Sequence, residues 1–302
     1  MSALTTIGLP VALGIIMFGL GLSLTLGDFA RVLKQPKAVI VALLCQLVLL
    51  PAICFGLVLA FQLPPVLAVG MMMLAASPGG TTANLYSHLF RGDVALNISL
   101  TAVNSVISVV TLPLITNFAI AYFDPFDSQL GMQWAKVLEV FAIVLVPVAI
   151  GMIVRRFWPA FAKAMDKPVR IASVIILIVV IAGAVAANWE LLVENFARLA
   201  LITIVFCLIS LTVGYLVPRL LKVGKRQAIA ASFEIGIHNA TLAIVIAQTV
   251  LGSVELSLPA AVYGVLMFFI AFGFGFLIRE RRTAAGEAVE GAGETPAPAA
   301  SS

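Results

Sequence analysis

The stretch ASFEIGIHNATLA, residues 231–243, lies inside a long apolar segment but places Glu234, His238 and Asn239 within six positions. A charged side chain near the centre of a bilayer costs about 2.5–3.5 kcal/mol on insertion scales, so such residues usually serve a function. His238 follows Glu234 by one helical turn, whereas Gly236 and Asn239 favour a local break in the helix. A break would expose backbone carbonyls beside a carboxylate, which is a set of ligands that a hard cation prefers.

The composition around this stretch is that of a membrane protein. The chain has 302 residues, of which 62% are hydrophobic and 11% charged, against about 25% charged residues in soluble domains. The apolar runs are continuous rather than alternating, which predicts helices and not a β-barrel. We therefore expect an all-α polytopic protein whose partner is the lipid bilayer, with no role in binding nucleic acid and no enzymatic activity. A monomer is possible.

Nine apolar segments are long enough to cross the membrane. They are residues 7–26, 38–61, 65–90, 94–122, 132–154, 170–188, 198–219, 226–250 and 258–278. Residues 1–282 then form one domain of nine transmembrane helices. Residues 283–302 are rich in Ala, Gly, Glu and Pro, and this composition predicts a disordered cytoplasmic tail.

The basic residues predict the orientation. Of the 18 Lys and Arg residues, all except Lys136 and Arg198 fall in the connections after the odd-numbered segments. Because basic residues stay on the cytoplasmic side, the N-terminus is expected outside and the C-terminus in the cytoplasm. We expect the protein in the inner membrane of a bacterial cell.

A second break is predicted in the third segment, where AASPGGTTANLYSHLF contains Pro78, Gly79 and Gly80. Proline removes a donor and unwinds the helix, which then restarts with Thr81, Thr82 and Asn84. The restarted helix would direct free N–H groups and a positive dipole end at an anion.

A polar stripe in the fourth segment supports a buried site. Asn97, Thr101, Asn104 and Ser108 are spaced by four, three and four residues, which places them on one helix face. Such residues also join membrane helices without binding a ligand. Two broken helices in matching segments, one running inward and the other outward, favour inverted repeats with a transport site between them. Repeat one would be residues 7–122, lacking its first helix, and repeat two residues 132–278.

The chain resembles the bacterial branch of the bile acid:sodium symporter family. The similar pieces are LGIIMFGLGLSLTLGDF (13–29), QPKAVIVALLCQLVLLPA (35–52), SPGGTTANLYSHLFRGDVALNISLT (77–101) and FEIGIHNATLA (233–243). The resemblance implies a core domain with two crossed, broken helices, a separate panel domain, and a sodium-coupled symporter that imports a small organic anion, such as a bile acid-like or pantoate-like carboxylate.

The resemblance also implies the site residues. The sodium ligands would be Gln46, Asn84, Asn97, Thr101 and Glu234, the carbonyls of Ile235 and Ile237, and His238. The substrate would contact Thr81, Thr82, Asn84 and Asn239. His238 and Ala83 depart from the family pattern, which often has Gln and Ser there. Since Na⁺ prefers oxygen, the His238 departure favours one Na⁺ over two.

Other interpretations remain open at this stage. A proton could replace the second ion at His238, since histidine titrates near neutral pH, or the carrier could be uncoupled. An ion channel would need a continuous polar pore, which a single central carboxylate does not provide. An arsenite carrier would need a thiol beside the broken helices, and we expect no Cys there.

Overall fold

The structure is a computed structural model that describes residues 8–123 and 134–279. The predicted tail, residues 283–302, lies outside the described residues, as does the start of the predicted segment 132–154. Helices account for the regular structure of the described ranges, apart from one isolated β-bridge.

Thirteen α-helices follow one another along the described chain. They are α1 (Leu9–Ser23), α2 (Leu26–Arg31), α3 (Pro36–Leu44), α4 (Leu50–Ala60), α5 (Pro65–Ala76), α6 (Thr81–Leu89), α7 (Val94–Phe123), α8 (Trp134–Phe157), α9 (Pro159–Ala187), α10 (Trp189–Leu220), α11 (Lys225–Gly236), α12 (Ala240–Val245) and α13 (Leu258–Ile278). A π-helical turn, η3 (Cys45–Leu49), joins α3 to α4, and a second, η4 (Ile246–Val250), extends α12. Two short 3₁₀ turns complete the described elements: η2 (Val32–Lys34) and η5 (Glu255–Ser257).

The helices are those of a polytopic membrane protein. By length and composition, five continuous helices in the described residues can cross a bilayer, or six when the bent pair α1 and α2 forms one span. Two of the other predicted segments are split into the shorter pairs α5–α6 and α11–α12, and the third falls on α8, part of which lies outside the described side chains. The count of nine crossings therefore stays a prediction.

The first predicted segment differs from the sequence expectation. Residues 7–26 were expected to form one helix, but α1 ends at Ser23 and α2 continues at an angle of 65°. Thr25 causes the break, because its backbone N–H and hydroxyl both donate to the Asp28 carboxylate at 2.7 Å. This capping box starts a new helix.

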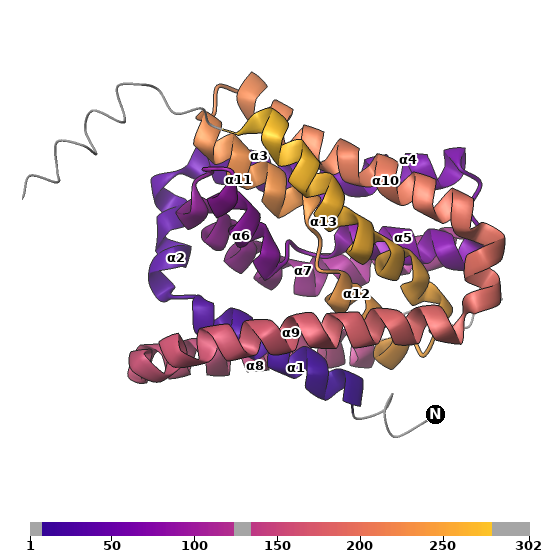
Figure 1. The fold of residues 1–302 in the computed structure, drawn as a ribbon, viewed down its shortest axis with the longest axis horizontal. Coiled ribbons are helices and arrows are strands. Elements are labelled where there is room, and N and C mark those ends of the chain that lie inside the picture. Colours follow the sequence, from indigo (N-terminus) through magenta and orange to yellow (C-terminus); the bar gives the residue numbers. More distant parts are fainter. Residues whose placement is uncertain (1–7, 124–133, 280–302) are drawn as a thin grey trace, which may run out of the picture.

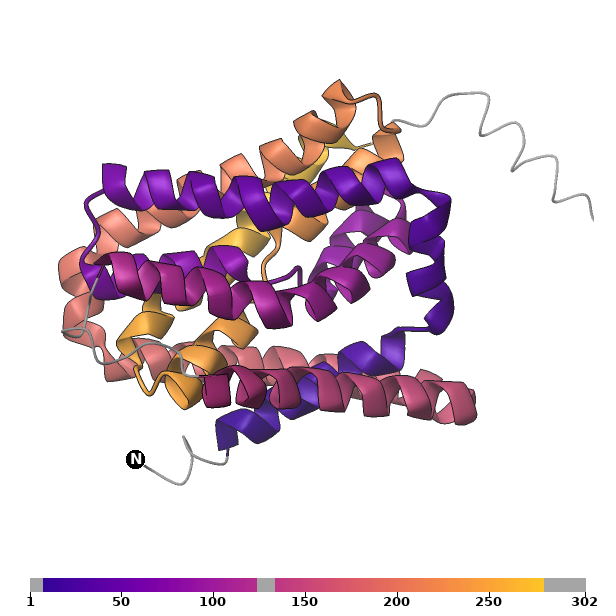
Figure 2. The ribbon, with the colours of Figure 1, turned by 180° about the vertical axis from the view of Figure 1, so that it is seen from behind.

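The helices form two layers (Figures 1 and 2). One layer, which we call the panel, contains α1, α8 and α9, and lies below the other helices in Figure 1. The other layer, which we call the core, contains α3–α7 and α10–α13. The segment α2 connects the two layers at one end.

Glycines hold the panel together. A Cβ added at Gly21 of α1 would collide with the backbone of Val148 in α8, and one added at Gly151 would collide with the carbonyl of Phe18. Small residues let membrane helices approach closely enough to gain dispersion energy, since lipid gives no hydrophobic driving force between them. The panel is therefore joined by close backbone packing.

The core is joined by polar contacts as well as packing. Its buried polar side chains include Gln46, Asn97, Thr101, Glu234 and His238, each at most 2% exposed. The two layers contact each other through α12, η4, α13 and α7, and Gly264 of α13 packs between Ala240 and Ile181 of α9. The polar site therefore lies within the core.

Candidate functional site

The two predicted helix breaks are present and their backbones cross. The chain is extended between α5 and α6 and again between α11 and α12, and the two linkers meet in an antiparallel bridge at Gly79 and His238 (Figure 1). Gly80 N–H donates to the Ile237 carbonyl at 2.9 Å, and Asn239 N–H donates to the Pro78 carbonyl at 2.8 Å. Unwound backbone is tolerated at membrane depth when its polar groups are paired, and each linker pairs the other.

The carboxyl group of Glu234 occupies the space beside this crossing. Gly79 makes room for it, because a Cβ at position 79 would collide with the Glu234 carboxyl group. Glu234 is 2% exposed and its Oε2 accepts a hydrogen bond of 2.5 Å from the Thr101 hydroxyl. Within the described residues, the other carboxylate oxygen, Oε1, has no hydrogen-bond donor.

The predicted polar stripe of α7 faces this carboxylate. Asn97, Thr101, Asn104 and Ser108 are all buried, with at most 2% of each exposed. Ser108 donates to the Ser105 carbonyl of its own helix, which ties it to α7 rather than to the crossing. The stripe therefore contributes its first three members to the site.

Two amide side chains have an orientation that their neighbours dictate. Asn97 Nδ2 donates to the Ala230 carbonyl at 2.7 Å, and Gln46 Nε2 donates to the Ser77 carbonyl at 3.0 Å. A carbonyl only accepts, so it must face the amide nitrogen, and the amide oxygen points elsewhere. Both of those oxygens are buried and lack a hydrogen-bond donor among the described residues.

Oxygens without a donor are the shared property of this site. The described residues leave five such buried oxygens near the crossing: Gln46 Oε1, Asn84 Oδ1, Asn97 Oδ1, Asn104 Oδ1 and Glu234 Oε1. A buried acceptor without a partner costs about 1–3 kcal/mol. A hard cation such as Na⁺ would satisfy several of these oxygens, since carbonyl and carboxylate oxygens are the ligands that hard cations take. The residues present therefore fit a cation.

The predicted substrate residues begin the two outgoing half-helices. Thr81 and Thr82 open α6, where Thr81 is exposed and Thr82 half-buried, and Asn84 follows one turn later. Asn239 caps α12, because its Oδ1 accepts from the N–H of Leu242 at 3.0 Å. The carbonyl of Ile237, a predicted sodium ligand, accepts a hydrogen bond from the Gly80 N–H. Part of the hydrogen-bonding capacity of this oxygen is therefore used at the crossing and not by an ion.

His238 is held in one tautomer. Its Nδ1 lies 3.1 Å from the Tyr263 hydroxyl, which itself donates to the Gly236 carbonyl at 2.9 Å. The single hydroxyl proton is thus committed, so Nδ1 must carry the hydrogen of this pair. Nε2 is then a bare lone pair, buried and without a donor in the described part of the chain.

Three features of the site were not predicted. Tyr263, in an apolar segment without a motif, orients His238. Gln46 sits in the π-helical turn η3, and such turns often occur at functional sites. The expectation that no thiol lies beside the broken helices is wrong, because the Cys207 thiol of α10 donates to the Gly236 carbonyl at 3.8 Å.

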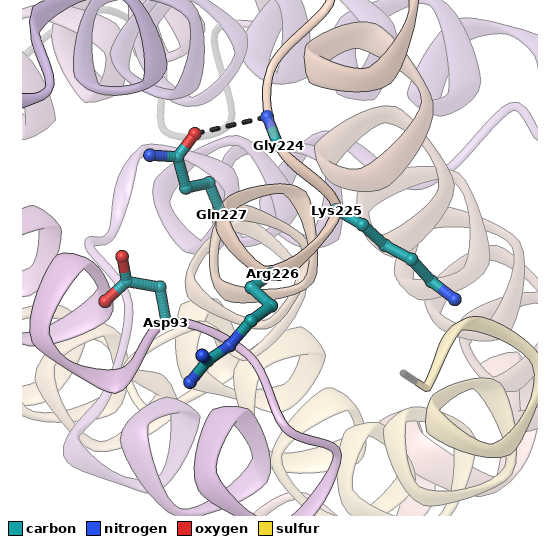
Figure 3. Close-up of a pocket in the computed structure, with 5 residues that line it drawn as sticks. All are labelled: Asp93, Gly224, Lys225, Arg226 and Gln227. Carbon is teal, nitrogen blue, oxygen red and sulfur yellow. Dashed lines mark hydrogen bonds between the residues drawn. The ribbon is translucent and has the colours of Figure 1, made fainter. Parts of the chain in front are cut away.

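An open pocket at the start of α11 is a separate feature (Figure 3). Asp93, Gly224, Lys225, Arg226 and Gln227 line it, and Lys225 points away from Asp93. Asp93 accepts from Gln35 at 3.2 Å and caps α7 through Leu96 N–H at 3.0 Å. The pocket is lined by a carboxylate as well as by basic side chains, and Asp93 connects helix ends. This lining fits a structural role better than anion binding.

Comparison with known proteins identifies the family. The family model described as the sodium bile acid symporter family matches residues 10–195. The chain belongs to this family. The family is one of transporters, and the apolar helices of the described residues are those of a multi-pass membrane protein.

Several curated relatives resemble most of the chain. An uncharacterized sodium-dependent transporter of Bacillus subtilis is 29% identical over 85% of this chain and 78% of its own length. The human ileal sodium/bile acid cotransporter is 25% identical over 91% of this chain and 79% of its own length. A probable chloroplastic sodium/metabolite cotransporter of rice is 25% identical, and this chain spans only 60% of it.

Proposed function

We propose that this protein is a sodium-coupled secondary transporter that imports a small organic anion, such as a bile acid-like or pantoate-like carboxylate. The observation that carries the proposal is the set of buried, donor-free oxygens around Glu234 at the crossing of two broken helices. The sodium-dependent relatives support a coupling cation, and the human relatives that transport bile acid or organic anions support the substrate class.

The cation would bind between α7 and the crossing. Glu234 supplies the negative charge, and Asn84 and Asn97 supply unpaired amide oxygens. The Ala230 carbonyl holds the Asn97 nitrogen and so directs the Asn97 oxygen away from itself. Thr101 holds the carboxylate in place through its hydroxyl. Gln46 and the carbonyls of Ile235 and Ile237 would complete the ligands of any second ion.

The anion would bind at the ends of the half-helices. The N-terminus of α6 has no side-chain cap, so its first N–H groups and positive dipole end are available to a carboxylate. Thr81 and Thr82 add hydroxyl donors there, and Asn239 presents its amide N–H₂ because its oxygen caps α12. The cation would favour this geometry through its contacts with both broken helices, which couples the two sites.

Transport would proceed by movement of the panel against the core. The panel is joined to itself by glycine packing and meets the core mainly through α12, η4, α13 and α7, so each layer can move as a body. We propose nine crossings arranged as two inverted repeats, in agreement with the antiparallel crossing of α5–α6 and α11–α12. The N-terminus would be outside and the C-terminus cytoplasmic, in the inner membrane.

A proton is the alternative to a second Na⁺. The bare Nε2 of His238 can accept a proton, whereas it is a poor ligand for Na⁺. Uptake measured against Na⁺ at fixed pH, and then against pH at fixed Na⁺, separates the two. Uptake that depends on Na⁺ but is constant across pH would exclude a proton as the second coupling ion.

Binding of ²²Na⁺ to the purified protein, with a thermal-shift screen of organic anions, tests the proposal. We expect Na⁺ to raise the melting temperature more than K⁺ does, and an accepted carboxylate to raise it further only when Na⁺ is present. Glu234→Ala should abolish Na⁺ binding, whereas Glu190→Ala should not, because Glu190 is exposed at the start of α10. Full Na⁺ binding by the Glu234 variant would refute the assignment.

A further inference from the structure

Asn104 is a buried amide of the α7 stripe to which the proposed function gives no role. It lies on α7, one turn after Thr101, and is 2% exposed. Thr101 donates to the Glu234 carboxylate at 2.5 Å, so Asn104 lies on the helix face that contacts the acid. The Asn104 oxygen Oδ1 is buried and has no donor among the described residues.

Packing alone does not explain this side chain. A leucine would fill similar space without leaving a buried acceptor unpaired, which costs stability. Asn97, two turns earlier on the same face, also has a buried oxygen without a donor, and its nitrogen donates to the Ala230 carbonyl. Two unpaired amide oxygens on one helix face indicate that these oxygens have a common partner.

We propose that Asn104 is a ligand of the coupling cation, so that this site combines the amide oxygens of Asn84, Asn97 and Asn104 with Glu234. The proposal rests on the cation of the proposed function and adds a ligand to it. A third amide oxygen replaces one more water of the hydrated ion without adding charge. The site therefore selects more strongly for an ion of one size. The amide side chains of α6 and α7 then determine the preference for Na⁺ over Li⁺.

Two substitutions at position 104 test whether its oxygen is a ligand. Asn104→Leu removes the side-chain oxygen, whereas Asn104→Thr keeps a neutral oxygen and adds no second carboxyl group beside Glu234. The matched control is Thr116→Val, since Thr116 is also buried on α7 and has an unpaired hydroxyl, but lies more than three turns from Asn104. All variants are made in the full chain and purified in detergent.

Equilibrium binding of ²²Na⁺, competed by Li⁺, is the measurement. We expect Asn104→Leu to weaken Na⁺ binding about tenfold or more and to narrow the preference for Na⁺ over Li⁺. Asn104→Thr should bind Na⁺ at least about threefold more tightly than Asn104→Leu, and Thr116→Val should be unchanged.

The proposal is overturned if Asn104→Leu keeps its affinity, or if Asn104→Thr is as weak as Asn104→Leu, because an oxygen at this position would then contribute nothing to Na⁺ binding. A purely structural role would lower the melting temperature without Na⁺ and leave the Na⁺/Li⁺ ratio unchanged. Absence of Na⁺ binding by the unmodified protein would instead refute the proposed function, so the two failures are distinguishable.

Discussion

The two broken helices of the core differ in what their breaks contain. The first break, Ser77 to Gly80, has no ionisable side chain and two glycines. The second, from Glu234 to Asn239, has an acid, an imidazole and an amide. In both, the chain leaves the helix where the two linkers meet, and each satisfies the other's backbone around the bridge between Gly79 and His238.

This difference indicates a division of roles. The first broken helix provides space, because Gly79 leaves room for the Glu234 carboxyl group, and it provides an uncapped helix start at α6. The second provides the charge and the imidazole. A symmetrical arrangement with an acid in both breaks would place two carboxylates together, which the interior of a membrane protein disfavours.

The two glycines of the first break allow the largest test of this comparison. Gly79→Ala should destabilise the protein by about 1–3 kcal/mol and displace the Glu234 carboxylate, because its Cβ would collide with that group. Gly80→Ala is the control, since the nearest atom would be 3.9 Å from its Cβ. Thermal unfolding and ²²Na⁺ binding check both variants, and equal behaviour of the two would show that the first break does not make room for the acid.

The contact between α7 and the second break allows a test of intermediate size. Thr101→Val keeps the shape of the side chain but removes the hydroxyl that donates to Glu234. A hydrogen bond to a charged group contributes about 1.5–3 kcal/mol, so we expect Na⁺ affinity to fall about tenfold or more.

Ser108→Ala is the control for this substitution, because Ser108 is buried on the same face but donates to its own helix. ²²Na⁺ binding by both variants is the measurement. If Ser108→Ala weakened binding as much as Thr101→Val, the effect would belong to α7 in general and not to the hydroxyl at Glu234.

The imidazole of the second break allows the smallest test. His238→Gln replaces a bare nitrogen with an amide that offers an oxygen, so a second Na⁺ should bind while the affinity at Glu234 changes by less than about threefold. The ratio of bound ²²Na⁺ to protein measures this. If the ratio of bound ²²Na⁺ to protein equals that of the unmodified protein, the Nε2 atom of His238 does not lie at the position of a sodium ligand.

Most of the site could be predicted from the sequence, because its residues are polar or helix-breaking residues within apolar helical segments. Glu234 in an apolar segment, the Pro78-Gly79-Gly80 break and the stripe on α7 all indicated a buried polar site, and their burial and the two breaks are confirmed. Tyr263 and Cys207 were missed, because a tyrosine or a cysteine in an apolar segment violates no rule. Their contacts with the second break depend on how α10 and α13 pack around it.

The sequence by itself determined that the chain is a helical membrane protein, that two of its segments are interrupted, and that one acid is buried among amides. Composition and local conformational preference decide these properties, since each depends only on the residues near it in the chain. Only the tertiary structure decided which amide oxygens are unpaired and that Gly79 makes room for Glu234. Those properties depend on acceptors such as Ala230 and Ser77, which lie on other helices, and the orientation of an amide is decided by the partner of its nitrogen.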